Sequence, residues 1–248
     1  MSEEKVSFGY RPVTPEEKRR LVREQFDPIA TTYDLADSVL SVGLDSRWRK
    51  KGIRLLELNQ GDRVLDLCGG TGDFALLAAE RTSPRGRTVI YDFNRAMMDA
   101  GRPKISRSSG PDRISFIQGD AESISFSGGA FEAITLGFGL RNFVHTEAGL
   151  REMHRVLKPN GRILILEFSL PRRKWQRALY DFYSFRIMPI IARMISGTAG
   201  PYRYLAESIR MHPDQHELKA LMQKAGFGHV DYHNMAGGVV ALHVGIKC

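Results

Sequence analysis

Val64-Leu-Asp-Leu-Cys-Gly-Gly-Thr-Gly-Asp73 runs from a predicted buried strand through a glycine turn into a predicted helix. Gly70 and Gly72 let the backbone turn tightly and approach a ligand closely, and the helix that follows has free backbone N–H groups in its first turn. Asp92 ends the next predicted strand, twenty residues beyond Gly72, where a carboxylate can accept hydrogen bonds from both ribose hydroxyls of a nucleoside. The stretch therefore predicts a nucleotide-binding strand–turn–helix unit.

Acidic residues around this turn distinguish two kinds of nucleotide cofactor. The glycine spacing alone also fits a dinucleotide fold. Asp73 directly follows the last glycine, however, where a carboxylate would repel a pyrophosphate resting on the helix N-terminus. Asp66 and Asp73 can instead meet the amino-acid end of S-adenosylmethionine, and Asp120 can accept a hydrogen bond from the adenine amino group. Each acid alone could be an ordinary strand-end cap, but together in this order they resemble the class I methyltransferase fold.

Strands and helices alternate around the glycine turn. Near-continuous apolar runs predict strands that are buried on both faces, as in a parallel sheet, and segments with helical spacing lie between them. We therefore predict an α/β protein with a Rossmann-like, doubly wound, seven-stranded, mostly parallel sheet whose last strand is antiparallel. The predicted strands are 63–68, 87–92, 114–118, 131–137, 161–168, 228–234 and 238–246, and the predicted helices are 74–81, 95–101, 147–157 and 214–225.

Two segments differ from this alternation. Residues 1–55 are predicted to form a helical N-terminal extension, and residues 56–248 the methyltransferase domain. Within that domain, residues 172–210 carry eight Lys or Arg against two acids, with seven interleaved aromatic residues. These aromatic residues could form ordinary core. Mixed with so many arginines, they also fit an amphipathic cap over an apolar ligand or a lipid surface, and we predict a helical substrate cap here.

Composition and charge exclude several classes of protein. The chain of 248 residues is 42% hydrophobic and 26% charged, which excludes a disordered chain. Cys68 and Cys248 are the only cysteines, so we expect a reducing, cytoplasmic setting with no disulfide framework. No secretory signal or membrane span is visible. The net charge of +8 suits nucleic acid or an anionic membrane surface, but without an RNA-binding signature we expect no nucleic-acid partner.

Two basic clusters, at residues 18–23 and 47–54, lie near the N-terminus. Such clusters are most often solvated helix faces. Together with residues 172–210 they could also form one positive surface that holds the protein at the inner face of a membrane with anionic lipids.

Longer motifs resemble one family of enzymes. Phe138-Gly-Leu-Arg-Asn142, Tyr202-Arg-Tyr-Leu-Ala-Glu-Ser-Ile209, Gly237-Gly-Val-Val-Ala-Leu-His243 and Phe26-Asp-Pro-Ile-Ala-Thr-Thr-Tyr-Asp34 resemble those of the menaquinone/ubiquinone biosynthesis C-methyltransferase family, and the resemblance covers about residues 24–246. It implies S-adenosylmethionine-dependent methylation of a ring carbon on a prenylated quinol. We expect demethylmenaquinol as the substrate, with 2-methoxy-6-polyprenyl-1,4-benzoquinol as a second acceptor.

The chain departs from the family pattern at several positions. Gly137 stands in place of a serine that lines the family's cofactor pocket, and His145 in place of an acid. Asp37 and Asp45 replace the usual Asn and His, and His212 replaces a Phe. The cofactor-binding residues that the resemblance implies are Thr71, Asp92, Asp120 and Ala121, beside Gly70 and Gly72 of the turn.

The implied reaction is an in-line displacement at a sulfonium methyl group, which requires alignment and exclusion of water but no metal. The ring carbon becomes nucleophilic when a neighbouring hydroxyl is deprotonated, so the site needs a base or a cation beside that oxygen. Arg141 is the candidate that stabilises the phenolate, and Asn142 the one that positions the ring oxygens; alternatively, Arg141 pairs with a structural acid. Tyr202 and Glu207 could reach the ring, although Glu207 could equally do no more than pair with an arginine.

Other interpretations remain open. A methyltransferase of this fold could act on a small polar metabolite, and the basic surface could make the chain an RNA-binding, methyltransferase-like protein. His212 and His216 have the spacing of two metal ligands on a helix, but no third ligand is evident, so we expect no metal. The sequence does not predict an oligomeric state.

Overall fold

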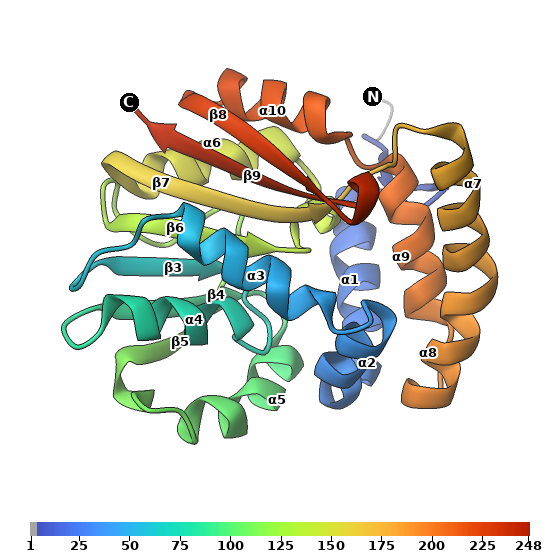
Figure 1. Ribbon diagram of the computed structural model, residues 1–248, viewed down its shortest axis with the longest axis horizontal. Helices are drawn as coiled ribbons and strands as arrows, with labels where there is room; N and C mark the ends of the chain where they lie inside the picture. The colour runs from blue at the N-terminus through green and yellow to red at the C-terminus, as the bar shows by residue number, and fades with distance from the viewer. Residues whose placement is uncertain (1–3) are drawn as a thin grey trace.

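A seven-stranded sheet in the order β5-β4-β3-β6-β7-β9-β8 runs through the computed structural model, which describes residues 4–248 (Figure 1). Strands β3 to β7 are parallel, and β9 pairs antiparallel with both β7 and β8. The predicted fold class, including the antiparallel last strand, is confirmed. The strands are β3 (Arg63–Leu67), β4 (Arg87–Asp92), β5 (Ile114–Gln118), β6 (Phe131–Gly137), β7 (Leu157–Phe168), β8 (Phe227–Met235) and β9 (Val240–Lys247).

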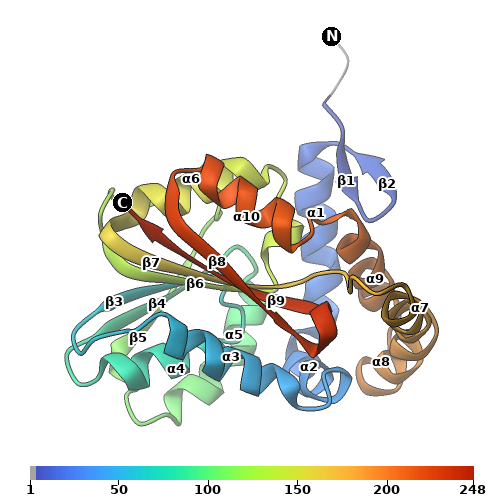
Figure 2. The ribbon, with the colours of Figure 1, turned by 45° about the horizontal axis from the view of Figure 1, so that its top comes forward.

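Helices cover both faces of the sheet (Figure 2). Because successive strand side chains point to opposite faces, Leu65 of β3 joins one apolar core with Leu150, whereas Val64 joins another with Trp48 and Phe74. Burial on both sides is why these strands appear as almost unbroken apolar runs. Helices α6 (Thr146–Val156) and α10 (Gln215–Lys224) lie on one face, and α3 (Leu44–Leu55), α4 (Asp73–Thr82) and α5 (Arg95–Ser106) on the other.

The N-terminal segment is not wholly helical, which corrects the prediction for residues 4–55; residues 1–3 of that prediction lie outside the described part. Strands β1 and β2 form an antiparallel hairpin, and Gly9 turns the chain with a φ of +57°. Strands of three residues are too short to show an alternating pattern, so the sequence does not reveal them. The elements are β1 (Val6–Phe8), β2 (Arg11–Val13), α1 (Pro15–Phe26), the 3-10 helix η1 (Asp27–Thr32) and α2 (Tyr33–Leu40).

Residues 172–210 fold mainly as helices that pack beside α1 and α2 at one end of the sheet (Figure 1). Met188 and Tyr202 from these helices share an apolar core with Ala36 of α2. Tyr204 stacks on Phe8 of the hairpin, with ring centroids 4.2 Å apart. The elements are α7 (Lys174–Phe182), a π-helical turn η4 (Tyr183–Ile187), α8 (Met188–Ser196) and α9 (Gly200–Met211).

Element bounds differ from the predictions at two further places. Helix α5 continues past Pro103 to Ser106, and β7 begins at Leu157, before the turn that was predicted to precede it. Short 3-10 helices complete the fold: η2 (Pro111–Arg113), η3 (Leu140–Asn142) and η5 (Ala236–Gly238). Within residues 4–248, no helix combines the length and the apolar character that crossing a membrane requires.

Candidate active site

A cavity of about 330 Å³ lies at the carboxyl ends of β3, β4, β5 and β6, where the strand order reverses and where folds of this kind bind ligands. We call it the glycine-loop cavity. Gly70 and Gly72 have φ values of +49° and +88°, which a side chain would oppose. It is lined, among others, by Asp66, Gly69, Gly70, Thr71, Asp73, Asp92, Asp120, Ala121, Gly137 and Asn142.

Asp92 presents a fixed carboxylate to this cavity. Its Oδ2 accepts a hydrogen bond from the backbone N–H of Gly70 at 2.9 Å, and its Oδ1 accepts one from the N–H of Asn94 at 2.8 Å. Burial raises the pKa of Asp92 to about 6, although the backbone hydrogen bonds act in the opposite direction. The carboxylate is therefore held in place by the glycine turn that it faces.

Asp120 and Ala121 follow β5 and line the same cavity. Asp120 Oδ1 accepts a hydrogen bond from the N–H of Glu122 at 2.8 Å, and Arg19 of α1 lies 3.5 Å from Oδ2. Arg19 and Val22 also line the cavity, so α1 covers it from above the strand ends.

Asp66 is buried below the glycine turn. Its Oδ1 accepts a hydrogen bond from the Thr135 hydroxyl at 2.7 Å, and its Oδ2 accepts one from the N–H of Ala75 at 3.0 Å. Burial raises the pKa of Asp66 to about 7, against these two hydrogen bonds. A positive group that enters the cavity would favour the ionised carboxylate.

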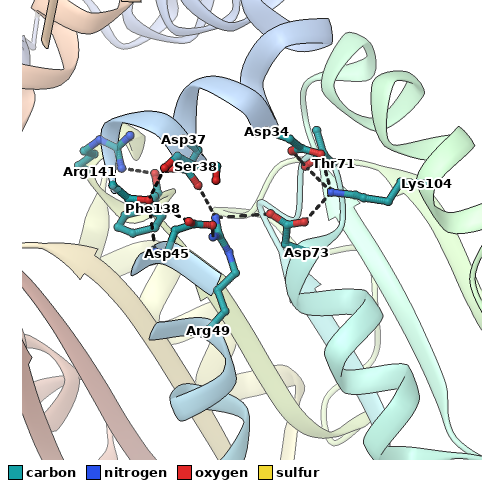
Figure 3. A network of polar contacts seen from close by, with 11 residues as sticks. Asp34, Asp37, Ser38, Asp45, Arg49, Thr71, Asp73, Lys104, Phe138 and Arg141 are labelled. Carbon is teal, nitrogen blue, oxygen red and sulfur yellow. Dashed lines mark hydrogen bonds and ion pairs between the residues drawn. The ribbon is translucent and has the colours of Figure 1, made fainter. Parts of the chain in front are cut away.

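A network of ionic contacts connects α2 and α3 to the glycine turn (Figure 3). Arg49 of α3 contacts Asp37 at 2.7 Å, Asp45 at 2.6 Å and Asp73 at 3.7 Å. This side chain is only 7% exposed, so the prediction of a solvated basic face over residues 47–54 is wrong for Arg49. Burial alone would lower the Arg49 pKa, but Asp37 and Asp73 raise it overall.

Thr71 belongs to the same network. Its hydroxyl donates to Asp34 Oδ1 at 2.6 Å and accepts from Lys104 at 3.3 Å (Figure 3). Lys104 also contacts Asp34 at 2.7 Å and Asp73 at 2.5 Å. Asp34 of α2 is thereby fixed over the glycine turn. The sequence does not reveal the contact between Asp34 and Lys104, because the two residues are 70 positions apart in the chain.

Lys18 of α1 is a second cation that the sequence misplaces on a solvated face. It is buried, and its ammonium group donates to the backbone oxygen of Phe143 at 2.5 Å. Burial lowers the Lys18 pKa to about 8, with Glu122 acting in the opposite direction. The lysine therefore ties α1 to the segment that follows Arg141 and Asn142.

A second cavity of about 110 Å³ adjoins the first. We call it the aromatic cavity. Phe26, Tyr33 and Phe138 line both cavities, so these three rings form the boundary between them. Within the part of the chain that the structure describes, Asp37 supplies the only carboxylate of its lining, and Arg141 the only cation. Aromatic side chains at the cavity are Phe26, Tyr33, Trp48, Phe138, Phe168, Tyr180, Tyr183, Tyr202 and Tyr204.

Arg141 lines the aromatic cavity with a buried guanidinium group. It contacts Glu167 at 2.9 Å, and it also donates to the backbone oxygen of Phe138. Its Nε has no hydrogen-bond partner among residues 4–248. Burial alone would lower the Arg141 pKa, but Glu167 and the nearby tyrosines Tyr33 and Tyr204 raise it overall. Arg141 therefore pairs with a structural acid, as one of the two interpretations expects, while its role toward a substrate stays a prediction.

The remaining predicted site residues lie at different places. Asn142 lines the glycine-loop cavity, and its Oδ1 accepts a hydrogen bond from Tyr204 at 3.0 Å. Tyr202 is buried and lines the aromatic cavity. Glu207 lines neither cavity: its Oε2 accepts from the N–H of Tyr10 at 3.4 Å, against the N-terminal hairpin.

Gly137 lies in the glycine-loop cavity beside Phe74. A Cβ atom at Gly137 would come within 2.9 Å of the Phe74 ring, so this ring occupies the space that a serine side chain at this position would need. His145 precedes α6, 3.6 Å from Glu4. Across residues 4–248, no three His, Cys, Asp or Glu side chains are grouped so that they could hold a metal ion.

Comparison with known proteins agrees with this arrangement. A model of the ubiE/COQ5 methyltransferase family matches residues 13–247. The chain belongs to that family. It is 46% identical over 246 residues to the ubiquinone/menaquinone biosynthesis C-methyltransferase UbiE of Pseudomonas putida, a match that covers 99% of this chain and 96% of the relative. The corresponding protein of Pseudomonas fluorescens is 45% identical with the same coverage.

Solved structures show the same fold at low sequence identity. A SAM-dependent methyltransferase from Aquifex aeolicus is 15% identical with a TM-score of 0.61, covering 95% of this chain and 100% of its own. The [4+2]-cyclase SpnF is 15% identical with a TM-score of 0.65, covering 91% of this chain and 94% of its own. This ubiE/COQ5 methyltransferase thus has a Rossmann-like class I fold and uses S-adenosylmethionine as its cofactor.

The glycine-loop cavity fits that cofactor. Asp92 offers a fixed, buried acceptor at the end of β4, where ribose hydroxyls would lie. Asp66 and Asp73 line the cavity at the turn, where their carboxylates would meet the ammonium group and the sulfonium of the cofactor. The same charges do not suit a pyrophosphate.

Proposed function

We propose that this protein transfers a methyl group from S-adenosylmethionine to a ring carbon of a reduced, prenylated quinol. Demethylmenaquinol is the first candidate substrate, and 2-methoxy-6-polyprenyl-1,4-benzoquinol the second. Two UbiE relatives whose names include both ubiquinone and menaquinone biosynthesis support this substrate class. The aromatic cavity supports it independently, because aromatic rings and apolar side chains form most of the lining and would bind a flat ring with an apolar tail.

The observation that carries the proposal is the buried Arg141 guanidinium in that cavity. Transfer to carbon requires negative charge on the neighbouring ring oxygen, and a preorganised cation stabilises such charge most strongly where water is excluded. Arg141 has a fixed position through Glu167, and its side chain lines the cavity that would hold the ring. We assign the phenolate-stabilising role to this group.

Asp37 is the group that can accept the hydroxyl proton. It lines the aromatic cavity, and burial raises its pKa, which suits a base. Arg49 bonds its Oδ2, so Oδ1 is the oxygen available to substrate.

The quinol hydroxyl gives its proton to Asp37, and the ring carbon forms a bond to the methyl group as the bond between methyl and sulfur breaks. The ring carbon then loses its hydrogen as a proton to solvent, and the oxygen regains a proton from Asp37. When bound, S-adenosylmethionine supplies the electrophilic methyl group.

Other residues bind and orient the reactants. Asp92 would accept hydrogen bonds from the ribose hydroxyls, Asp120 and Ala121 would contact the adenine, and Thr71 would hold the amino-acid end of the cofactor. Asn142 has its oxygen bonded to Tyr204, which leaves its amide N–H groups to position a ring oxygen. Tyr33 and Phe138, at the boundary of both cavities, exclude water from the transfer.

A methyl-transfer assay tests the proposal. Labelled S-adenosylmethionine is incubated with reduced demethylmenaquinol and, separately, with the reduced benzoquinol, both in detergent. Labelled product from either supports the proposal and names the substrate. If both remain unlabelled while a polar, lipid-free phenol is methylated, the substrate class is wrong.

The role of Arg141 is tested in the same assay with the double variant Arg141→Met, Glu167→Gln. Removing both partners avoids leaving an unpaired buried carboxylate. We expect kcat to fall about 100-fold or more while cofactor affinity is retained. Arg162→Met, which removes the surface pair between Arg162 and Glu57, is the matched control and should keep wild-type activity.

A further inference from the structure

Apolar side chains are exposed in a row along the outer side of α7 and α8. Trp175, Leu179, Phe182, Ile190 and Met194 follow helical spacing and are 62%, 62%, 58%, 64% and 82% exposed. A surface helix of a globular protein normally presents polar residues on this side. Together these five residues form what we call the α7–α8 outer face, which lies at the edge of the molecule, away from the sheet (Figure 1).

The inner side of the same helices is apolar as well. Met188 and Ala192 are buried in the core that joins these helices to α2. The folding core therefore does not account for the outer row, and an exposed apolar patch of this kind marks an interaction site.

Cations without acidic partners lie on the same segment as the α7–α8 outer face. They are exposed, and within residues 4–248 none lies within 4.0 Å of a carboxylate; Asp181, the acid nearest in sequence, pairs instead with Arg210. Exposed cations on a helical segment that also exposes apolar side chains suit binding to anionic lipid. The cations are Arg172, Arg173, Lys174, Arg177, Arg186 and Arg193.

Helix α2 extends this surface. Leu35 and Val39 are 58% and 44% exposed, and Val42, just beyond the helix, is 84% exposed. Helices α2 and α8 pack against each other, as both views show (Figures 1 and 2). Two neighbouring helices thus expose apolar side chains.

We propose that the α7–α8 outer face, extended by α2, docks this enzyme on an anionic lipid bilayer. This inference rests in part on the proposed function, because a prenylated quinol resides in the bilayer. Tyr180, Tyr183 and Met188, on the inner side of the same segment, line the aromatic cavity. Docking by this surface therefore brings the substrate cavity to within one helix thickness of the lipid.

Vesicle flotation tests docking without any substrate. The full-length protein is mixed with vesicles of phosphatidylcholine alone or of phosphatidylcholine with phosphatidylglycerol. We expect flotation with the anionic vesicles, weakening as salt is raised, and little with the neutral ones. Equal binding to both, or no binding, contradicts the proposal. Binding to a second copy of the chain, seen as a stable dimer in which Leu179→Ser reduces dimerisation, would replace it with a protein interface.

Trp175 provides a direct report on the surface. The chain has two tryptophans, and Trp48 is buried, so a change in emission on adding vesicles comes from Trp175. We expect a blue shift with anionic vesicles and quenching by lipids brominated in the acyl chain. Trp175→Phe should abolish the shift while the protein still floats. Flotation without a shift would place the contact on another surface.

Substitutions separate this face from the rest of the basic surface. Arg177→Ser with Arg193→Ser should lower partition to anionic vesicles about 30-fold, roughly fivefold for each cation near the surface. Arg81→Ser with Arg85→Ser removes the same charge from exposed positions at the end of α4 and should have a small effect. Equal losses in the two double variants would show that net charge alone governs binding.

Activity measurements distinguish failure of docking from failure of the proposed function. Leu179→Ser with Ile190→Ser should keep wild-type turnover of a short-chain, water-soluble quinol and lose at least tenfold on a long-chain quinol in vesicles. If wild-type enzyme methylates neither quinol, the proposed function fails, and the flotation result still decides the docking surface. Equal turnover of the vesicle quinol by both proteins contradicts the coupling between docking and substrate access.

Discussion

Replacing Asp66 by Asn should make the cofactor-free protein more stable and should weaken its binding of S-adenosylmethionine. Asp66 is 1% exposed, and its two oxygens accept hydrogen bonds from Thr135 and Ala75. An asparagine can keep both contacts: its oxygen accepts from the Ala75 N–H, and its amide donates to the Thr135 hydroxyl. The substitution therefore removes a buried charge and little else.

The size of the effect follows from the Asp66 pKa. An exposed aspartate has a pKa of about 3.9, whereas burial raises that of Asp66 to about 7. The folded protein therefore binds a proton more tightly than the unfolded chain does, and the ionised carboxylate destabilises the folded state as pH rises above about 4. At about 1.4 kcal/mol for each pKa unit, the free energy of unfolding should increase in Asp66→Asn by roughly 4 kcal/mol at pH 8 and by about a third of that at pH 5.

Urea unfolding at pH 5 and pH 8 measures these differences, and calorimetry measures cofactor binding. The affinity of the wild-type protein for S-adenosylmethionine should decrease as the pH is lowered below 7, because the positive ligand favours ionised Asp66. In Asp66→Asn this pH dependence should be weaker, and the affinity at pH 8 should be at least tenfold lower than that of the wild type. Thr135→Val is the control: it removes a hydrogen bond to the charge and should destabilise the protein. An Asp66→Asn protein that is less stable than wild type at pH 8, or gains equally at both pH values, refutes the reasoning.

Three further substitutions test the site. Asp37→Asn should lower kcat about 100-fold and remove the rise of turnover with pH through the raised Asp37 pKa; an unchanged pH–rate profile would exclude Asp37 as the base. Arg49→Met leaves Asp37 and Asp45 without their buried cation, whereas Asp73 keeps Lys104. The free energy of unfolding at neutral pH should therefore fall by roughly 3–5 kcal/mol. Urea titration measures this loss, which should be smaller at pH 5. Gly137→Ser should cost about 1–3 kcal/mol because its Cβ would meet Phe74 at 2.9 Å, and an unchanged melting temperature would show that this ring moves aside freely.

The sequence predicts the sheet and the glycine turn well because their signals are local. Burial of β3 on both faces requires an unbroken apolar run, and the turn after it requires glycine at Gly70 and Gly72. Asp92 is equally predictable, because its place is set by the end of the next strand.

The ionic network could not be predicted, because its partners are far apart in the chain. Arg49 and Lys18 look like parts of solvated basic faces, yet both are buried by partners from other elements: Asp73 for Arg49, and the backbone oxygen of Phe143 for Lys18. Pairing of Arg141 with a structural acid is one of the two interpretations that the sequence allows, but the sequence does not identify Glu167, which the pairing of β6 with β7 brings beside it. Glu207 points to the hairpin, whose strands are too short to be seen in the sequence.

The position of the new methyl group on the product distinguishes transfer to carbon from transfer to oxygen. After reaction with reduced demethylmenaquinol, the product is isolated, analysed by mass spectrometry and NMR, and exposed to air. The account predicts a methyl group on the ring carbon with both hydroxyls free, so the product still oxidises to a quinone. A methyl ether that resists oxidation would contradict it, because the oxygen that we assign to Arg141 would then be the acceptor.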